Sequence, residues 1–163
     1  MQVAHGIRRQ SDGIEFVIAV FDDWDALQTV LEDMVTEHGP RLSATVLHAR
    51  KDNPKPAVSS CLSNGSIQLH FARSNQYITC TSGDVAEGLA ARLASGARTL
   101  ADALHSWMSS DQAWQLQCHI EKGRLVLWLP LTTSEEFGAV CGRLVHASPH
   151  MIGLCNIDFR ARP

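Results

Sequence analysis

The sequence has no apolar run long enough to cross a membrane. A transmembrane helix needs about 20 consecutive apolar residues, and polar or charged residues interrupt every apolar run of this chain well before that length. Residues Met1 to Asp12 also lack the apolar centre of a secretory signal peptide. We therefore expect a cytoplasmic protein with no membrane partner.

The chain also lacks an excess of positive charge. Its 14 Lys and Arg residues are outnumbered by 17 Asp and Glu residues, which leaves a formal net charge of -3. Basic residues form nothing larger than a pair such as Arg8-Arg9. Nucleic-acid-binding domains normally carry a clustered basic surface, so we expect no nucleic-acid partner.

Cysteines are few and have no regular spacing. There are five, an odd number, and no two of them form a C-x-x-C pair. This pattern is typical of small buried apolar side chains rather than of a disulfide framework. We expect reduced thiols, which agrees with a cytoplasmic location.

Recognisable catalytic and nucleotide-binding motifs are missing as well. The sequence contains no G-x-S-x-G elbow, and Gly138 and Gly142 lie inside a predicted helix rather than between a strand and a helix, where phosphate loops occur. A Cys80–His70 pair could meet across a hairpin as nucleophile and base, but a buried thiol is the preferred explanation of Cys80. We therefore assign no catalytic residue and no cofactor.

What the sequence does contain is one β-α-β pattern that occurs twice, at residues 13–50 and 123–160. Each copy begins at a glycine, continues through an apolar run of strand length, and reaches a helix with one apolar stripe. The first runs are Phe16 to Phe21 and Leu125 to Leu131, and they are apolar on both faces. The second strands, Leu42 to Ala49 and Met151 to Phe159, mix polar and apolar residues, as strands nearer a sheet edge do.

Two such units predict an α+β fold with the ferredoxin-like split βαβ arrangement, as an internal repeat within a single domain of residues 1–163. The first strands would be central in a four-stranded antiparallel sheet, with both helices on one face. The other face of these apolar strands then needs a cover. Residues 58–120 are our first candidate for that cover, and a second subunit in a homodimer is the alternative.

Residues 58–120 are predicted to form a hairpin and a helical insertion. Asn64-Gly65 is a strong hairpin signal between Val58–Leu62 and Ile67–Phe71, and Gln76–Thr81 would add a short strand. A capping box at Asp84 would start a helical stretch that breaks near Ser95-Gly96. Ser109 would cap a last short helix that ends at Gly123.

Candidate binding residues are aromatic or imidazole side chains of the insertion and its neighbours. Trp107 and Trp114 flank the turn at Ser109, and indoles often line pockets or interfaces, although packing onto the sheet explains them too. With His48 and His70 they are our candidates for a ligand or partner site. Cys141, His146 and His150, near Cys155, are weaker candidates for a metal site, because their spacing does not match that of known zinc ligands.

The strand Phe16 to Phe21 leading through Asp22 into a helix, the Ala/Gly-containing helical stretch and the closing β-α-β unit together resemble bacterial general-stress-type proteins. The resemblance covers both ends of the chain and residues 84–120. It departs where Arg92, Arg98 and Asp102 interrupt the middle stretch, which is often glycine-rich in those proteins. It implies a fold and a link to stress adaptation, and it supplies no catalytic residues.

These observations predict a non-enzymatic binding or regulatory module of the bacterial cytoplasm, active as a homodimer. The alternative is a small ferredoxin-like enzyme or a small-molecule-binding protein whose pocket lies between the sheet and the helical insertion. Such folds host both kinds of activity, so this choice depends on the geometry of the site. A metal-dependent protein using Cys141, His146 and His150 is a third hypothesis.

Overall fold

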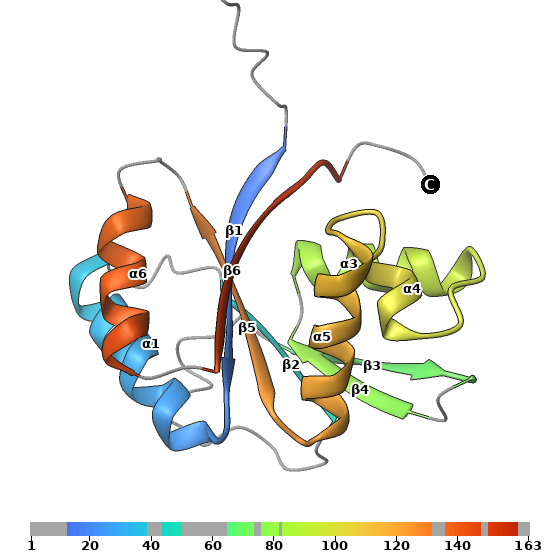
Figure 1. The fold of residues 1–163 in the computed structure, drawn as a ribbon, viewed down its shortest axis with the longest axis horizontal. Helices are drawn as coiled ribbons and strands as arrows, with labels where there is room; N and C mark the ends of the chain where they lie inside the picture. The colour runs from blue at the N-terminus through green and yellow to red at the C-terminus, as the bar shows by residue number, and fades with distance from the viewer. Residues whose placement is uncertain are drawn as a thin grey trace, which may run out of the picture.

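A computed structural model describes residues 13–38, 44–49, 65–73, 76–81, 83–131, 136–147 and 150–159. Within these residues the chain forms an α+β fold of six strands and five helices (Figure 1). In chain order the elements are β1 (Ile14–Phe21), α1 (Trp24–His38), β2 (Thr45–His48), β3 (Ser66–Phe71), β4 (Gln76–Thr81), α3 (Asp84–Ala94), α4 (Leu100–Leu104), α5 (Ser110–Glu121), β5 (Leu125–Leu131), α6 (Glu136–His146) and β6 (Met151–Ile157). None of the described helices has the length and apolar character needed to span a bilayer.

All six strands belong to one antiparallel sheet, in the order β3-β4-β2-β5-β1-β6. β1 and β5 lie side by side, with Ile18 opposite Trp128. β5 separates β1 from β2, and β1 separates β5 from β6. The two strands of each β-α-β unit therefore lie on either side of the first strand of the other unit: β5 lies between β2 and β1, and β1 lies between β5 and β6.

The helices of the two units cover one face of the sheet. Alternate residues of β1, including Val17 and Ala19, pack with Leu125 and Leu127 of β5 against α1 and α6. The apolar stripes of these helices are buried there, at Trp24, Leu27, Val30, Leu31, Met34, Val140 and Leu144. The predicted apolar stripe of α1 is therefore confirmed, whereas that of α6 is confirmed only at Val140 and Leu144, because Phe137 and Val145 are exposed.

The helices of the insertion cover the opposite face. Phe16, Ile18 and Val20 of β1 point to this side and pack with Leu89 of α3 and Leu100 of α4. In Figure 1 the sheet is seen nearly edge-on, with α1 and α6 on one side and α3, α4 and α5 on the other. The insertion thus provides the second cover that the doubly apolar central strands require, and the molecule has three layers.

The position of β2 differs from the sequence prediction. We expected it near a sheet edge because polar residues interrupt its apolar pattern, but β4 pairs with its outer side and β5 with its inner side. All four of its residues are buried. A side chain of β4 adds to this pairing, since the hydroxyl of Thr81 accepts a 2.9 Å hydrogen bond from the backbone N–H of Val46.

The described hairpin of the insertion joins the predicted strand at Ile67–Phe71 to the predicted short strand Gln76–Thr81. β3 pairs with β4, from Ser66 opposite Thr81 to Phe71 opposite Gln76, so the connection follows Phe71. The predicted strand Val58–Leu62 and Asn64 lie outside the described residues. Ile67 and Leu69 were correctly assigned to a strand, but its described partner is the following segment, because their apolar side chains join the core with Ile78 and Cys80.

Helix boundaries in the insertion follow local signals with one exception. α3 ends before Gly96, which has a φ of 106°, and α5 ends before Gly123, which has a φ of 77°. Ser109 caps α5, as predicted, and the structure shows that it does so in a full capping box with Gln112. The predicted capping box at Asp84 is wrong, because Gly83 is the N-cap residue and α3 begins at Asp84 itself.

A buried glutamine joins two helices of the insertion. Gln117 of α5 is 4% exposed, and its side-chain oxygen accepts a 3.0 Å hydrogen bond from the backbone N–H of Ala101 at the start of α4. Its amide nitrogen donates to Glu121 at 2.9 Å. A buried polar side chain is stabilising only when its groups are paired, and Gln117 uses its pairing to fix α4 against α5.

An aromatic cluster fills the centre of the insertion side. Phe16, Trp128, Trp107 and Phe159 contact one another edge to face in a closed ring, with centroids between 5.9 and 6.2 Å apart. Gly88 of α3 lies directly against Trp107, and a Cβ at this position would come within 2.7 Å of the indole ring. A glycine inside α3 is therefore required by close packing at this position.

Replacing Trp128 with Ala tests the importance of this cluster. Trp128 is fully buried, so W128A should lower the free energy of unfolding by ~3–5 kcal/mol, the usual cost of removing a large buried aromatic side chain. Urea denaturation followed by circular dichroism measures the change. W114A is the matched control: Trp114 is 56% exposed, and its loss should change stability by less than ~0.5 kcal/mol. Equal effects of the two substitutions would contradict the assignment of Trp128 to the core.

Candidate functional site

The four candidate binding residues from the sequence lie in separate places. His48 is 2% exposed on β2 and meets Trp24 of α1 edge to face, with centroids 5.1 Å apart. His70 is exposed on β3 and stacks on Tyr77, with centroids 4.3 Å apart. Trp107 packs in the aromatic cluster on the other side of the sheet, and Trp114 is solvent-exposed on α5. The structure does not bring these side chains together in one pocket.

The Cys80–His70 pair considered for catalysis is separated by the sheet. Cys80 belongs to the core on the insertion side, whereas His70 alternates with the core residues Leu69 and Phe71 and points to the opposite face. Burial raises the pKa of Cys80 to about 12. The thiolate is the nucleophilic form of cysteine, and burial keeps Cys80 in the thiol form at neutral pH.

The weaker metal candidates are likewise dispersed. Cys155 is buried on the insertion side of the sheet, whereas Cys141 and His146 are on α6, which covers the other side. His146 contacts the Gly142 carbonyl, and His150 contacts Asp22. Among the described residues, no group of three or more His, Cys, Asp and Glu side chains has the geometry of a metal site.

The space between the sheet and the insertion is closed where Met108 and Gln112 approach Ile18 and Gly153. The gap at this place has no volume accessible to a water molecule. The pocket that the sequence analysis placed between these layers has no counterpart at this contact.

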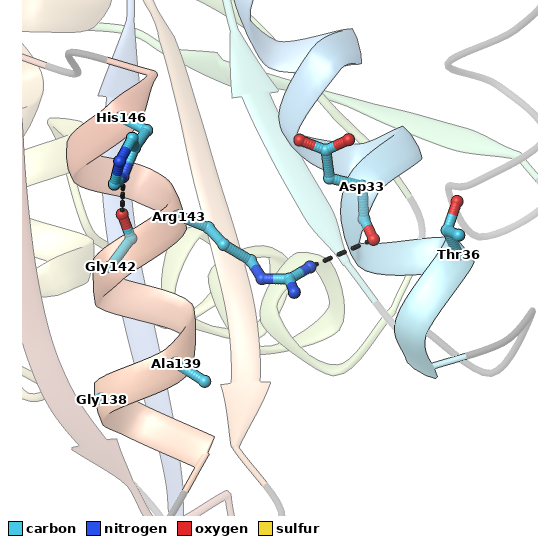
Figure 2. Close-up of a pocket in the computed structure, with 7 residues that line it drawn as sticks. All are labelled: Asp33, Thr36, Gly138, Ala139, Gly142, Arg143 and His146. Atoms are coloured by element: carbon cyan, nitrogen blue, oxygen red, sulfur yellow. Dashed lines mark hydrogen bonds between the residues drawn. The ribbon is translucent and has the colours of Figure 1, made fainter.

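An open groove lies instead on the opposite side of the sheet, between α1 and α6. It has a volume of about 670 Å³, in the range of small-molecule sites. Asp33 and Thr36 of α1 line one wall, and the other is formed by Gly138, Ala139, Gly142, Arg143 and His146 of α6 (Figure 2). The groove exists because two helices from the two β-α-β units lie beside each other on one face.

Two hydrogen bonds organise the polar side chains of the groove. Arg143 extends across it and donates from Nη1 to the backbone carbonyl of Asp33 at 3.2 Å (Figure 2). His146 Nδ1 is 2.6 Å from the carbonyl oxygen of Gly142. Since a carbonyl only accepts, Nδ1 carries the proton and Nε2 is the ring atom that remains for another partner.

Two of the residues on the α6 wall of the groove are glycines, Gly138 and Gly142. Apart from its chain neighbours and the backbone of its own helix, a Cβ built on Gly138 or on Gly142 would meet no atom of the described residues within 4 Å. Glycine in a helix interior costs about 0.8–1.0 kcal/mol relative to alanine. At Gly88 a larger residue would clash with Trp107, whereas no described neighbour requires a glycine at Gly138 or Gly142. The absence of side chains at these two positions leaves the groove open.

A second cluster of polar side chains lies at one end of the sheet. Asp22 follows β1, whereas Arg124 and His150 directly precede β5 and β6. Because β1 is antiparallel to both strands, its end adjoins their beginnings, with Phe21 opposite Leu125 and Val20 opposite Met151. His119, in the last turn of α5, completes the cluster.

The four side chains form a continuous chain of contacts. Asp22 Oδ1 accepts from Arg124 Nε at 3.1 Å, and Asp22 Oδ2 is 2.6 Å from His150 Nε2. Arg124 Nη1 is 2.9 Å from His119 Nδ1. Hydrogen bonds from His150 and Arg124 lower the pKa of the Asp22 carboxyl below its ordinary value of 3.8. Asp22 is therefore ionised at any pH at which the protein is expected to work.

This cluster was not predicted from the sequence. Asp22 and Asp23 were both expected at the start of α1, and it is Asp23 whose carboxylate accepts a 2.9 Å hydrogen bond from the N–H of Ala26. His150 was considered only as a metal ligand. The usable signal was the position of Asp22, Arg124 and His150 at neighbouring ends of three strands, which becomes informative only once the strand order is known.

The chain has no match among the protein-family models, the curated proteins or the solved structures with which it was compared.

Alanine substitutions at glycines separate the open groove from the packed aromatic cluster. G142A should raise the free energy of unfolding by about 0.5–1 kcal/mol, because alanine favours the helix and meets no neighbour. G88A should instead lower it by ~1 kcal/mol or more, because the new methyl group overlaps Trp107. Urea unfolding curves of both variants measure the difference. A loss of stability in G142A would mean that the space above Gly142 is filled.

Proposed function

We propose that this chain is a non-enzymatic binding module whose ligand occupies the groove between α1 and α6. The groove volume of about 670 Å³ is the observation that carries the proposal. It suits a compound of small-molecule size, with an apolar part over Gly138 and Gly142 and a hydrogen-bonding group near Arg143 and His146. We keep the bacterial cytoplasm and a role in stress adaptation as part of the same proposal.

The surroundings of the groove favour binding over catalysis. The polar atoms that face it belong to a guanidinium, an imidazole, a hydroxyl and a carboxylate, and no cysteine lines it. The hydroxyl of Thr36 donates to the backbone carbonyl of Glu32 at 2.9 Å, so it is not activated by a base. These groups are suited to orienting a ligand by hydrogen bonds.

We also propose that the four strands β2-β5-β1-β6 form a ferredoxin-like split βαβ core, with β3, β4, α3, α4 and α5 as an insertion. The order of these strands and the placement of α1 and α6 on one face support this interpretation. The groove would then lie between the two helices that the pseudo-repeat relates to each other.

A fragment screen by NMR tests the binding proposal. Compounds from a mixed fragment library are added to the labelled protein, and amide shift changes are mapped. We expect the largest changes around Asp33, Gly138 and Gly142. In G142L the new side chain enters the open space. The fragments should therefore bind at least tenfold more weakly, which is a loss of about 1.4 kcal/mol in binding free energy.

A91L is the matched control, because Ala91 is also an exposed helical position but lies on α3, across the sheet from the groove. This variant should bind the same fragments as the unmodified protein. Fragments that shift residues elsewhere, or that bind G142L unchanged, would show that the groove is not the binding site.

The exposed edge beside α6 supports the homodimer. β6 pairs with β1 and has no strand on its other side among the described residues. Leu154 of β6 is 44% exposed on the side of the sheet that α6 covers, and Phe137 and Val145 of α6 are 39% and 63% exposed. Apolar side chains beside an unpaired strand edge are a common basis of self-association.

We therefore expect the protein to have twice the mass of one chain by light scattering after gel filtration. L154E should give a monomer, because it places a charge in the apolar surface beside β6. Y77E is the control: Tyr77 is 58% exposed but lies on β4, near the other edge of the sheet, so this variant should remain a dimer. An unmodified protein that is monomeric refutes the homodimer and leaves the groove proposal standing.

A further inference from the structure

The hydrogen bond between His119 and Arg124 restricts the protonation state of the histidine. A guanidinium has only N–H donors, so at the 2.9 Å contact His119 Nδ1 must be the acceptor. The ring is then neutral and carries its proton on Nε2. Protonation of Nδ1 would remove the acceptor and place two cations in contact.

We propose that the contact between His119 and Arg124 is a pH-sensitive latch that fastens the last turn of α5 to the strand ends of the sheet. His119 belongs to the insertion, whereas Arg124 is fixed by Asp22 at the end of β1. Arg124 is joined to His119 a second time, since its backbone N–H donates to the His119 carbonyl at 3.1 Å. Release of the side-chain contact leaves this backbone bond without support.

The charges around His119 make its protonation unfavourable. Arg124 before β5, His150 before β6 and Lys122 at the end of α5 are basic, and among the described residues Asp22 after β1 is the carboxylate that acts on the ring. Both oxygens of Asp22 already accept from Arg124 and His150. The carboxylate is therefore not positioned to compensate a new charge on His119.

The direction of the pH effect follows from the two pKa shifts. Burial first, and then Arg124, His150 and Lys122, lower the pKa of His119 below its ordinary value of 6.5. The latch therefore stabilises the fold fully above pH 6.5, and this stability is lost as the pH falls through the lower folded-state pKa. The pKa of Asp22 is lowered below 3.8, so the carboxylate stays charged while His119 is released.

Two measurements test the latch. Nitrogen shifts of the imidazole at pH 8 should show His119 with its proton on Nε2. Hydrogen exchange, corrected for the intrinsic effect of pH, should show the amides of Lys122, Gly123 and Arg124 losing protection by ~tenfold for each pH unit between 6.5 and the lower folded-state pKa of His119, with no further loss below that pKa. These amides make the hydrogen bonds that close the end of α5.

H119Q should retain an acceptor for Arg124 but cannot titrate, so protection of the same amides should not change between pH 8 and pH 5. H105Q is the control, because His105 is an exposed histidine of the same insertion, and it should behave as the unmodified protein. A proton on Nδ1 of His119 at pH 8 would contradict the latch, and the unmodified protein is sufficient to detect it. An equal loss of protection in H119Q overturns it as well.

Discussion

Both faces of the two central strands must be shielded from water, and the rest of the structure depends on this constraint. Consecutive residues of β1 point alternately to α1 and α6 and to the insertion, and the same is true of β5. The helices of the two β-α-β units suffice for one face only. The insertion is therefore part of the hydrophobic core, although it interrupts the repeat in the sequence.

The two covers differ in how closely they pack. On the insertion side, Gly88 allows Trp107 to approach α3 and complete an aromatic cluster, and the contact of Met108 and Gln112 with the sheet leaves no room for water. On the other side, Gly138 and Gly142 border an open groove between α1 and α6. The same residue type thus closes one face and opens the other, which places the candidate binding surface away from the insertion.

The antiparallel pairing of the central strands also creates the polar cluster at the end of the sheet. It brings the residue after β1 beside the residues that precede β5 and β6. The resulting contacts connect Asp22 to His119 through Arg124, so the insertion and the sheet share one set of charges. Because Asp22 holds Arg124 in place as a hydrogen-bond donor, the protonation state of His119 affects the packing of α5.

The sequence by itself determined the features that depend on near neighbours along the chain. Apolar runs and helical stripes gave the strands and helices of both units, and Ser109, Gly96 and Gly123 marked helix boundaries, because caps and periodicity involve residues within about one helical turn. The need to cover both faces of β1 and β5 could also be deduced. Tertiary structure alone decided that β4 pairs with β2, that α1 and α6 border a groove, and that Asp22 meets Arg124 and His150. Those features depend on which distant segments pair, and local patterns carry no information about the partner.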